Sequence, residues 1–204
     1  MIIKKYDVKD ILLDSAYKWK ELINYKYVIT YGYKNKLYTI NLCFSPEEYQ
    51  HLAGFHYLKD IVIPKYNSKV LIDRILEEKI TYDKIIKSNN FETMVKPRLE
   101  ALIILKTSLD SDFILYSYMK RMYPFTTTIN ADYIISYKGD KNSFTFIVKS
   151  SDQLDGERNY LCCSVFTEGE RDYSINQRQR IVLRKERIYI PSNESTILYN
   201  RLKL

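Results

Sequence analysis

Both histidines of this 204-residue chain, His51 and His56, lie in one short stretch, Phe44 to Ile61, which reads FSPEEYQHLAGFHYLKDI. Histidine suits general acid–base chemistry because its ordinary pKa, about 6.5, lies close to neutral pH. Lys59 follows His56 within one helical turn, and a lysine ammonium group can bind a phosphate. The residue types therefore predict proton transfer beside a phosphate.

The stretch from Phe44 to Ile61 has the start signals of a helix. Ser45 can serve as the N-cap, Pro46 suits the first helical position, and Glu48 completes a capping box. On one continuous helix, at about 100° per residue, both imidazoles and the Lys59 ammonium share an arc of about 140°. Gly54, in mid-helix, costs about 1 kcal/mol relative to alanine, which predicts a close packing neighbour there.

The same helix allows one other interpretation of the histidines and argues against a metal site. In that other interpretation, the histidines are half-buried, hydrogen-bonded residues of a packed helix with no chemical role. A metal site is not predicted, because their spacing of five residues does not stack two ligands on one helix face. Asp60 also points away from His51 on the same helical wheel, and no cofactor is expected.

The segment Tyr38–Ile61 resembles a motif of the phage and mobile-element nucleases named for barnase, EndoU, the colicin nucleases and RelE (the BECR fold). A second, looser block near the C-terminus fits the same family, and the resemblance covers about residues 25–190. Where the family often has a lysine directly after the second histidine, this chain has Tyr57, and its nearest lysine is Lys59. The matching positions of the two blocks are Tyr49, His51, Leu52, Gly54, Phe55, His56, Leu58, Asp60 and Ile61, then Ser164, Phe166, Asp172, Tyr173, Gln177 and Val182–Ile188.

The resemblance implies a metal-independent endoribonuclease in which a ribose 2′-hydroxyl attacks its own phosphate and leaves a 2′,3′-cyclic phosphate. The site residues that we expect have three kinds of role. His51 and His56 are the acid–base candidates and Lys59 is the cation. Ser164, Tyr173 and Gln177 orient the phosphate or base, and Arg178 and Arg180 bind the RNA backbone.

Two other functions remain open from the sequence. One is a catalytically inactive binding protein with the same fold, either an inhibitor of a host defence system or a nucleic-acid-binding module. The other is a structural accessory protein of a phage. RNA is the expected partner of the nuclease, and a cognate inhibitor or host protein is a further possible partner.

The composition of the chain indicates the kind of partner and the cellular location that we expect. The net charge of +7 favours an acidic partner such as nucleic acid, although many Lys, Ile, Asn and Tyr residues are also typical of AT-rich genomes. Three cysteines, two of them adjacent at 162 and 163, favour reduced thiols. With no apolar run of about 18 residues and no signal peptide, we expect a cytoplasmic protein without a membrane partner.

The periodicities predict an α+β fold in a single domain, 1–204. An amphipathic helix over 7–24 precedes a hairpin of Tyr27–Tyr33 and Lys36–Phe44. Residues 68–110 read as a helical insert or cap. Strands follow at Phe113–Met119, Asp132–Lys138, Ser143–Lys149, Asn159–Phe166 and Arg178–Ile190.

Short turns between these strands predict an antiparallel sheet. By strand parity, Arg178, Arg180 and Arg184 should share one face of the last strand, where they could bind phosphates. The alternative is that these charges only keep an exposed strand soluble.

Overall fold

The chain begins with a helix and a hairpin that together carry the two-histidine segment. In the computed structural model, which describes residues 10–154, 157–169 and 171–202, helix α1 spans Ile11–Leu22. Strands β1 (Tyr25–Tyr33) and β2 (Lys36–Cys43) turn through Lys34 and Asn35, which both have positive φ. This left-handed pair gives the tight turn that a two-residue hairpin needs. Of the predicted helix, residues 7–9 lie outside the described residues.

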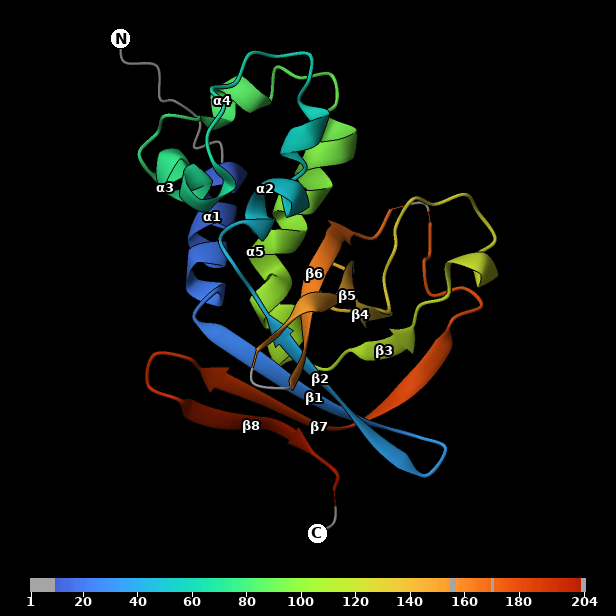
Figure 1. The fold of residues 1–204 in the computed structure, drawn as a ribbon. Coiled ribbons are helices and arrows are strands. Elements are labelled where there is room, and N and C mark those ends of the chain that lie inside the picture. Colours follow the sequence, from blue (N-terminus) through green and yellow to red (C-terminus); the bar gives the residue numbers. More distant parts are fainter. Residues whose placement is uncertain (1–9, 155–156, 170, 203–204) are drawn as a thin grey trace.

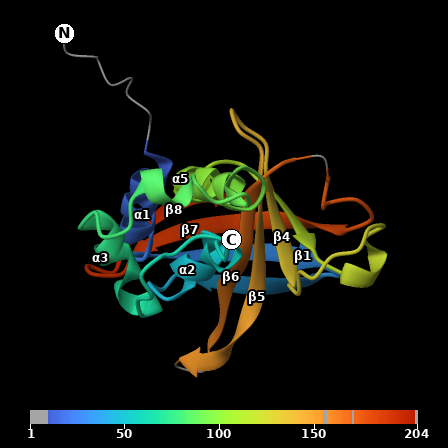
Figure 2. The same ribbon diagram turned by 90° about the horizontal axis from the view of Figure 1, so that it is seen from above.

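Helices occupy the middle of the chain, as predicted for residues 68–110. Helix α5 lies beside α1 and packs on the sheet at β5 and β6 (Figures 1 and 2). That this region is an insert or cap, within one domain, stays a prediction. The helical elements after β2 are α2 (Glu48–Leu52), η1 (Phe55–Tyr57), η2 (Ser68–Val70), α3 (Leu71–Leu76), α4 (Tyr82–Ile85), the π-helix η3 (Phe91–Val95) and α5 (Lys96–Asp110).

The strands form a closed barrel rather than an open antiparallel sheet. In the described ranges the strand order is β1-β2-β6-β5-β4-β3-β7-β8, and β1 also pairs with β7, so 7 strands close a ring and β8 lies outside it. The mixed helix-and-sheet class is confirmed, but the antiparallel prediction holds only in part because β2 and β6 pair in parallel. The remaining elements are β3 (Ile114–Ser117), η4 (Lys120–Met122), β4 (Tyr133–Tyr137), β5 (Ser143–Leu154), β6 (Glu157–Thr167), β7 (Arg178–Tyr189) and β8 (Glu194–Asn200).

A bulge in β7 overturns the predicted arginine face. Tyr31 pairs with Val182 and Thr30 pairs with Arg184, so Leu183 is an extra residue in the ladder. An extra residue reverses the in–out alternation along a strand. Arg184 therefore lies on the opposite face from Arg180, and the expected row of three arginines is not formed.

The start of the two-histidine segment is fastened to α1. The Trp19 indole Nε1 donates a hydrogen bond of 3.0 Å to the carbonyl oxygen of Ser45. The hydroxyls of Ser15 and Tyr49 form a buried hydrogen bond of 2.7 Å. Because Trp19 and Tyr49 are both fully buried, the helix that carries His51 has a fixed position against the core.

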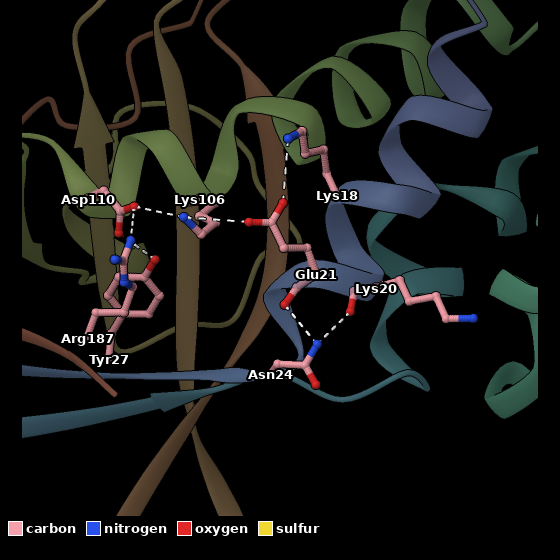
Figure 3. Close-up of polar contacts among 8 residues, drawn as sticks. All are labelled: Lys18, Lys20, Glu21, Asn24, Tyr27, Lys106, Asp110 and Arg187. Carbon is pink, nitrogen blue, oxygen red and sulfur yellow. Dashed lines mark hydrogen bonds and ion pairs between the residues drawn. The ribbon is translucent and has the colours of Figure 1, made fainter. Parts of the chain in front are cut away.

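A polar network around Asp110 joins α1, α5 and the barrel (Figure 3). The Asp110 carboxylate accepts a hydrogen bond of 2.7 Å from the Tyr27 hydroxyl and is also bound by the Arg187 guanidinium. Lys106 Nζ lies 3.1 Å from Asp110 and 3.7 Å from Glu21. Burial, reinforced by Asp110, raises the pKa of Tyr27, so its hydroxyl stays protonated and available to donate.

None of the helices in the described ranges has both the length and the apolar character that crossing a membrane requires.

Candidate active site

The two histidines stand on two short helical pieces, not on one long helix. Helix α2 ends after Leu52, and Gly54 then has φ of +80° before the 3₁₀ turn η1 begins at Phe55. The prediction of one continuous helix from Phe44 to Ile61 is therefore wrong, because a residue in the left-handed region ends an α-helix. The predicted cap is also displaced: α2 begins at Glu48 with Glu47 as its N-cap and no side-chain capping bond, and the Ser45 hydroxyl instead donates to the Glu48 side chain, at Oε1, over 3.3 Å.

Breaking the helix at Gly54 brings the two imidazoles face to face. The rings of His51 and His56 are stacked with centroids 4.8 Å apart and an interplanar angle of 12°. Both residues are exposed, which is not the environment of half-buried core histidines. Partial burial lowers the pKa of His56, and the nearby positive charges of His51, Arg98 and Lys59 lower it further. His56 is therefore mainly neutral at pH 7, the form that can accept a proton.

Both rings face a cavity of about 520 Å³, hereafter the histidine cavity. Its walls come from four parts of the chain: the two-histidine segment, η3 with the start of α5, the loop 126–130, and β6 with the loop that follows it. The polar and charged side chains that line it include His51, His56, Arg98, Ser164, Arg171 and Tyr173.

Arg98 is the most enclosed cation of the histidine cavity. Its guanidinium lies over the ring of Tyr57, 4.8 Å from the centroid, and 5.7 Å from that of Phe166. It donates to the carbonyl oxygen of Met94, and more weakly, at 3.4 Å, to the Tyr57 hydroxyl. Burial lowers its pKa, but an arginine remains charged at neutral pH. These contacts hold a fixed positive charge close to the histidine pair.

The lack of a side chain at Gly54 allows Arg98 to lie close to the histidine pair. A Cβ atom at position 54 would be 2.9 Å from Arg98 Cδ and 3.2 Å from the carbonyl oxygen of Met94. The predicted close neighbour of Gly54 is therefore present, and it is the helix that carries the cation. Glycine also adopts the required φ without the strain of a side chain.

Ser164 and Tyr173 reach the same cavity from the other side. Ser164 lies on β6, two residues before Phe166, and both line the cavity as strand parity predicts. The Tyr173 ring stacks on Tyr123, with centroids 4.8 Å apart, and packs edge-on against Phe144, Phe146 and Phe166. This aromatic cluster fixes the ring of Tyr173 at the cavity wall.

Arg171 connects the last loop with the loop 126–130. It donates from Nη1 to the carbonyl oxygen of Thr126 at 3.3 Å and lies over the ring of Phe125. Its side chain is exposed, so a second positive charge is available at the rim of the cavity.

Four of the predicted site residues do not line the histidine cavity. Lys59 lines a neighbouring cavity, not the histidine cavity. Gln177 holds the chain in place: its amide accepts from the backbone N–H of Met119 at 2.7 Å and donates to the same residue's carbonyl. Arg180 donates to Ser117 Oγ at 2.7 Å and stacks 3.8 Å over Tyr33. Arg178 pairs with Ser117 in the β3–β7 ladder.

The family model for phage-Barnase-EndoU-ColicinE5/D-RelE like nuclease 4 matches residues 11–202. The chain belongs to this nuclease family. No curated protein and no solved structure gives a significant match. Family membership supports a nuclease and leaves the substrate and the mechanism to be argued from the site.

Sequence reasoning missed Arg98 as a member of the site. It lies 42 positions beyond His56 in the chain, directly after the Pro97 that marks a helix start, and no local pattern links the two. The only signal was the mid-segment Gly54, which predicted a close neighbour without saying which. Among the described residues, no group of three or more His, Cys, Asp or Glu side chains could hold a metal ion.

Proposed function

We propose that this member of the nuclease family is an endoribonuclease that needs no metal ion and cleaves RNA by attack of a ribose 2′-hydroxyl on the adjacent phosphate. The observation that carries the proposal is the stacked pair of imidazoles, 4.8 Å apart, facing a cavity that also contains Arg98. An acid, a base and a fixed cation are the groups that this reaction uses. RNA is accordingly the proposed partner, in the cytoplasm of a bacterial or phage-infected host cell.

His56 is assigned as the general base and His51 as the general acid. The lowered pKa of His56 keeps it neutral, so it can take the 2′-hydroxyl proton as that oxygen bonds to phosphorus. His51 in its protonated form gives a proton to the 5′-oxygen as its bond to phosphorus breaks. The attacking and leaving oxygens occupy opposite sides of phosphorus, and two parallel rings 4.8 Å apart can each serve one of them. The product is a 2′,3′-cyclic phosphate and a free 5′-hydroxyl.

Arg98 is assigned as the cation that stabilises the negative charge of the transition state. It is held by Tyr57, Phe166 and the Met94 carbonyl before substrate arrives, and such preorganised charges lower the barrier most effectively. Arg171, Ser164 and Tyr173 complete the cavity and can donate hydrogen bonds to phosphate oxygens or a base.

The test is incubation of the purified protein with RNA in the presence of EDTA. Controls are the same sequence with 2′-O-methyl groups and a His51→Ala/His56→Ala variant whose folding is checked by circular dichroism. We expect cleavage of unmodified RNA by the wild-type protein alone, with cyclic-phosphate ends. Cleavage of the 2′-O-methyl strand would contradict the mechanism, since that strand has no attacking hydroxyl. Tight RNA binding without cleavage would instead favour the inactive binding protein.

A further inference from the structure

A second cavity shares His56 with the histidine cavity and has no part in the mechanism above. This flanking cavity measures about 560 Å³ and lies between η1, the chain that follows it, and the start of α3. Its volume is within the range of small-molecule and nucleotide sites. Because His56 lines both cavities, a chain passing over this residue would enter one cavity from the other.

The walls of the flanking cavity combine aromatic and aliphatic surface with positive charge. Phe55, Ile63 and Tyr66 contribute apolar surface, and Lys59 and Lys65 contribute two ammonium groups. Both lysines are exposed, while Tyr66 is half-buried. No Asp or Glu is found among the lining residues in the described part of the chain. An aromatic floor with lysines is the combination that binds single-stranded nucleic acid, through base stacking and phosphate contacts.

We propose that the flanking cavity binds the nucleotide next to the cleaved phosphate, so that the RNA strand crosses His56 with one nucleotide in each cavity. The proposal rests on the proposed function, whose reacting phosphate it places at the shared histidine. Tyr66 offers a ring on which a base can stack. Lys59 and Lys65 each bind one of the two phosphates beyond it. Lys59 thus becomes a substrate-binding residue, not the cation of the transition state.

A protein inhibitor is the other class of occupant that an apolar cavity could accept. RNA is favoured because the charged lining groups are cationic and because the cavity is continuous with the proposed cleavage site through His56. An RNA strand presents a phosphate at every nucleotide, and each phosphate that a lysine neutralises makes binding more sensitive to salt.

The experiment measures the affinity of 2′-O-methyl RNA, which the proposed reaction cannot cleave, as a dimer and as a hexamer over a range of salt concentrations. The variants are Lys59→Ala/Lys65→Ala and Tyr66→Leu. The matched control is Lys79→Ala/Lys87→Ala, which removes the same charge from exposed lysines of the same helical region outside both cavities. Thermal unfolding verifies that each variant is folded.

We expect the lysine pair variant to bind the hexamer about tenfold more weakly and to lower the slope of log affinity against log salt by about 1.4, which corresponds to two phosphates of a single strand. Tyr66→Leu should cost about tenfold in hexamer affinity through lost stacking. The lysine pair variant should bind the dimer as the wild-type protein does, because a dimer has no phosphate beyond the flanking cavity. Tyr66→Leu should weaken dimer binding as well, because the second base of the dimer stacks on this ring. The control variant should keep the wild-type slope.

Equal hexamer affinities for wild type and both variants would overturn this inference. If the wild-type protein still cleaved RNA in that case, the proposed function would stand and the flanking cavity would serve another occupant, such as an inhibitor. If the wild-type protein neither bound nor cleaved RNA, both proposals would fall.

Discussion

The backbone of Gly54 lies directly against the side chain of Arg98: a Cβ atom at position 54 would come within 2.9 Å of Arg98 Cδ. Gly54 thus ends the helix between the two histidines, turns the chain there, and makes room for the cation. The geometry of the whole candidate site depends on this close approach.

Replacing Gly54 with alanine should therefore damage stability and activity together. The positive φ of +80° and the contact with Arg98 should lower the free energy of unfolding by about 2–4 kcal/mol. RNA cleavage should fall further than the loss of folded protein explains, because Arg98 must move. The matched control is Gly169→Ala, whose Cβ would meet nothing within 4 Å and should change stability by under about 0.5 kcal/mol. Equal effects of the two substitutions, measured by urea unfolding, would refute the argument.

The pH dependence of cleavage should show His56 titrating below its ordinary value. Burial and the charges of His51, Arg98 and Lys59 lower the pKa of His56, so the acidic limb of the rate profile should have its midpoint below about pH 6.5. Arg98→Gln removes one of those charges and should move the limb to higher pH. Because the chain has only two histidines, their ring protons can be followed separately by NMR. A limb that does not move in the variant would contradict the assignment of His56 as base.

Arg98 and Lys59 can be separated as candidate cations by kinetics. Arg98→Gln should lower kcat by about 100- to 1000-fold, the usual effect of removing one transition-state donor. Lys59→Gln should change kcat by less than about tenfold and act mainly on KM. Arg98→Lys, which keeps the charge but not the planar donor group, should fall between them. A larger loss of kcat for Lys59→Gln would restore the lysine as the catalytic cation.

Glu48, one turn before His51, should make the protein less stable as pH rises. Burial raises the pKa of its carboxyl to about 7 from 4.5, and its Oε2 has no hydrogen-bond partner. The folded state then binds more protons than the unfolded state between these values, so stability falls with rising pH. Glu48→Gln should remove that fall and stabilise the protein at pH 8 by roughly 2–3 kcal/mol.

The neighbouring carboxyl supplies the control for this prediction. Hydrogen bonds from its own backbone and from Ser45, and then contact with Lys69, lower the pKa of Glu47. Its effect on stability has the opposite sign, because the ionised form is favoured in the fold and is lost as pH falls. Urea unfolding of both glutamine variants at pH 4.5 and pH 8 distinguishes the two signs.

Asp110 should matter far more for stability than an exposed ion pair of similar length. Asp110→Asn weakens the contacts of a carboxylate bound by Tyr27, Arg187 and Lys106 (Figure 3), at a cost of about 2–4 kcal/mol. The control, Asp73→Asn, removes the pair with Lys20 at 2.8 Å, in which both side chains are more than half exposed, and should cost under about 1 kcal/mol. Similar losses in thermal unfolding would show that the network is not cooperative.

Local patterns predicted most of the elements and one half of the site. The apolar period of α1, the Lys34-Asn35 turn and the alternation in β4 to β7 depend on residues close together in the chain. The histidine segment and Ser164 with Phe166 were recognised in the same way. Strand β8 was missed because its residues are mostly exposed and lack a buried face to reveal a period of two.

The errors arose where distant segments meet. The parallel pairing of β2 with β6 joins strands more than a hundred residues apart, and the bulge at Leu183 is defined by its partner strand β1. Parity counted along β7 alone therefore placed Arg184 on the wrong face. Lys59 was expected as the cation because it is the lysine nearest to His56 along the chain, and its role relative to Arg98 stays a prediction.

The sequence by itself determined the reactive residue types, the two blocks that resemble the nuclease family, and the local helices and strands, since each depends on neighbouring residues. Only the tertiary structure decided that the imidazoles stack, that Arg98 lies beside them, and that Lys59 faces a separate cavity. These relationships come from the packing of α5 against Gly54 and from closure of the barrel. Such long-range contacts are made by shape and burial, which leave no periodic signal in the chain.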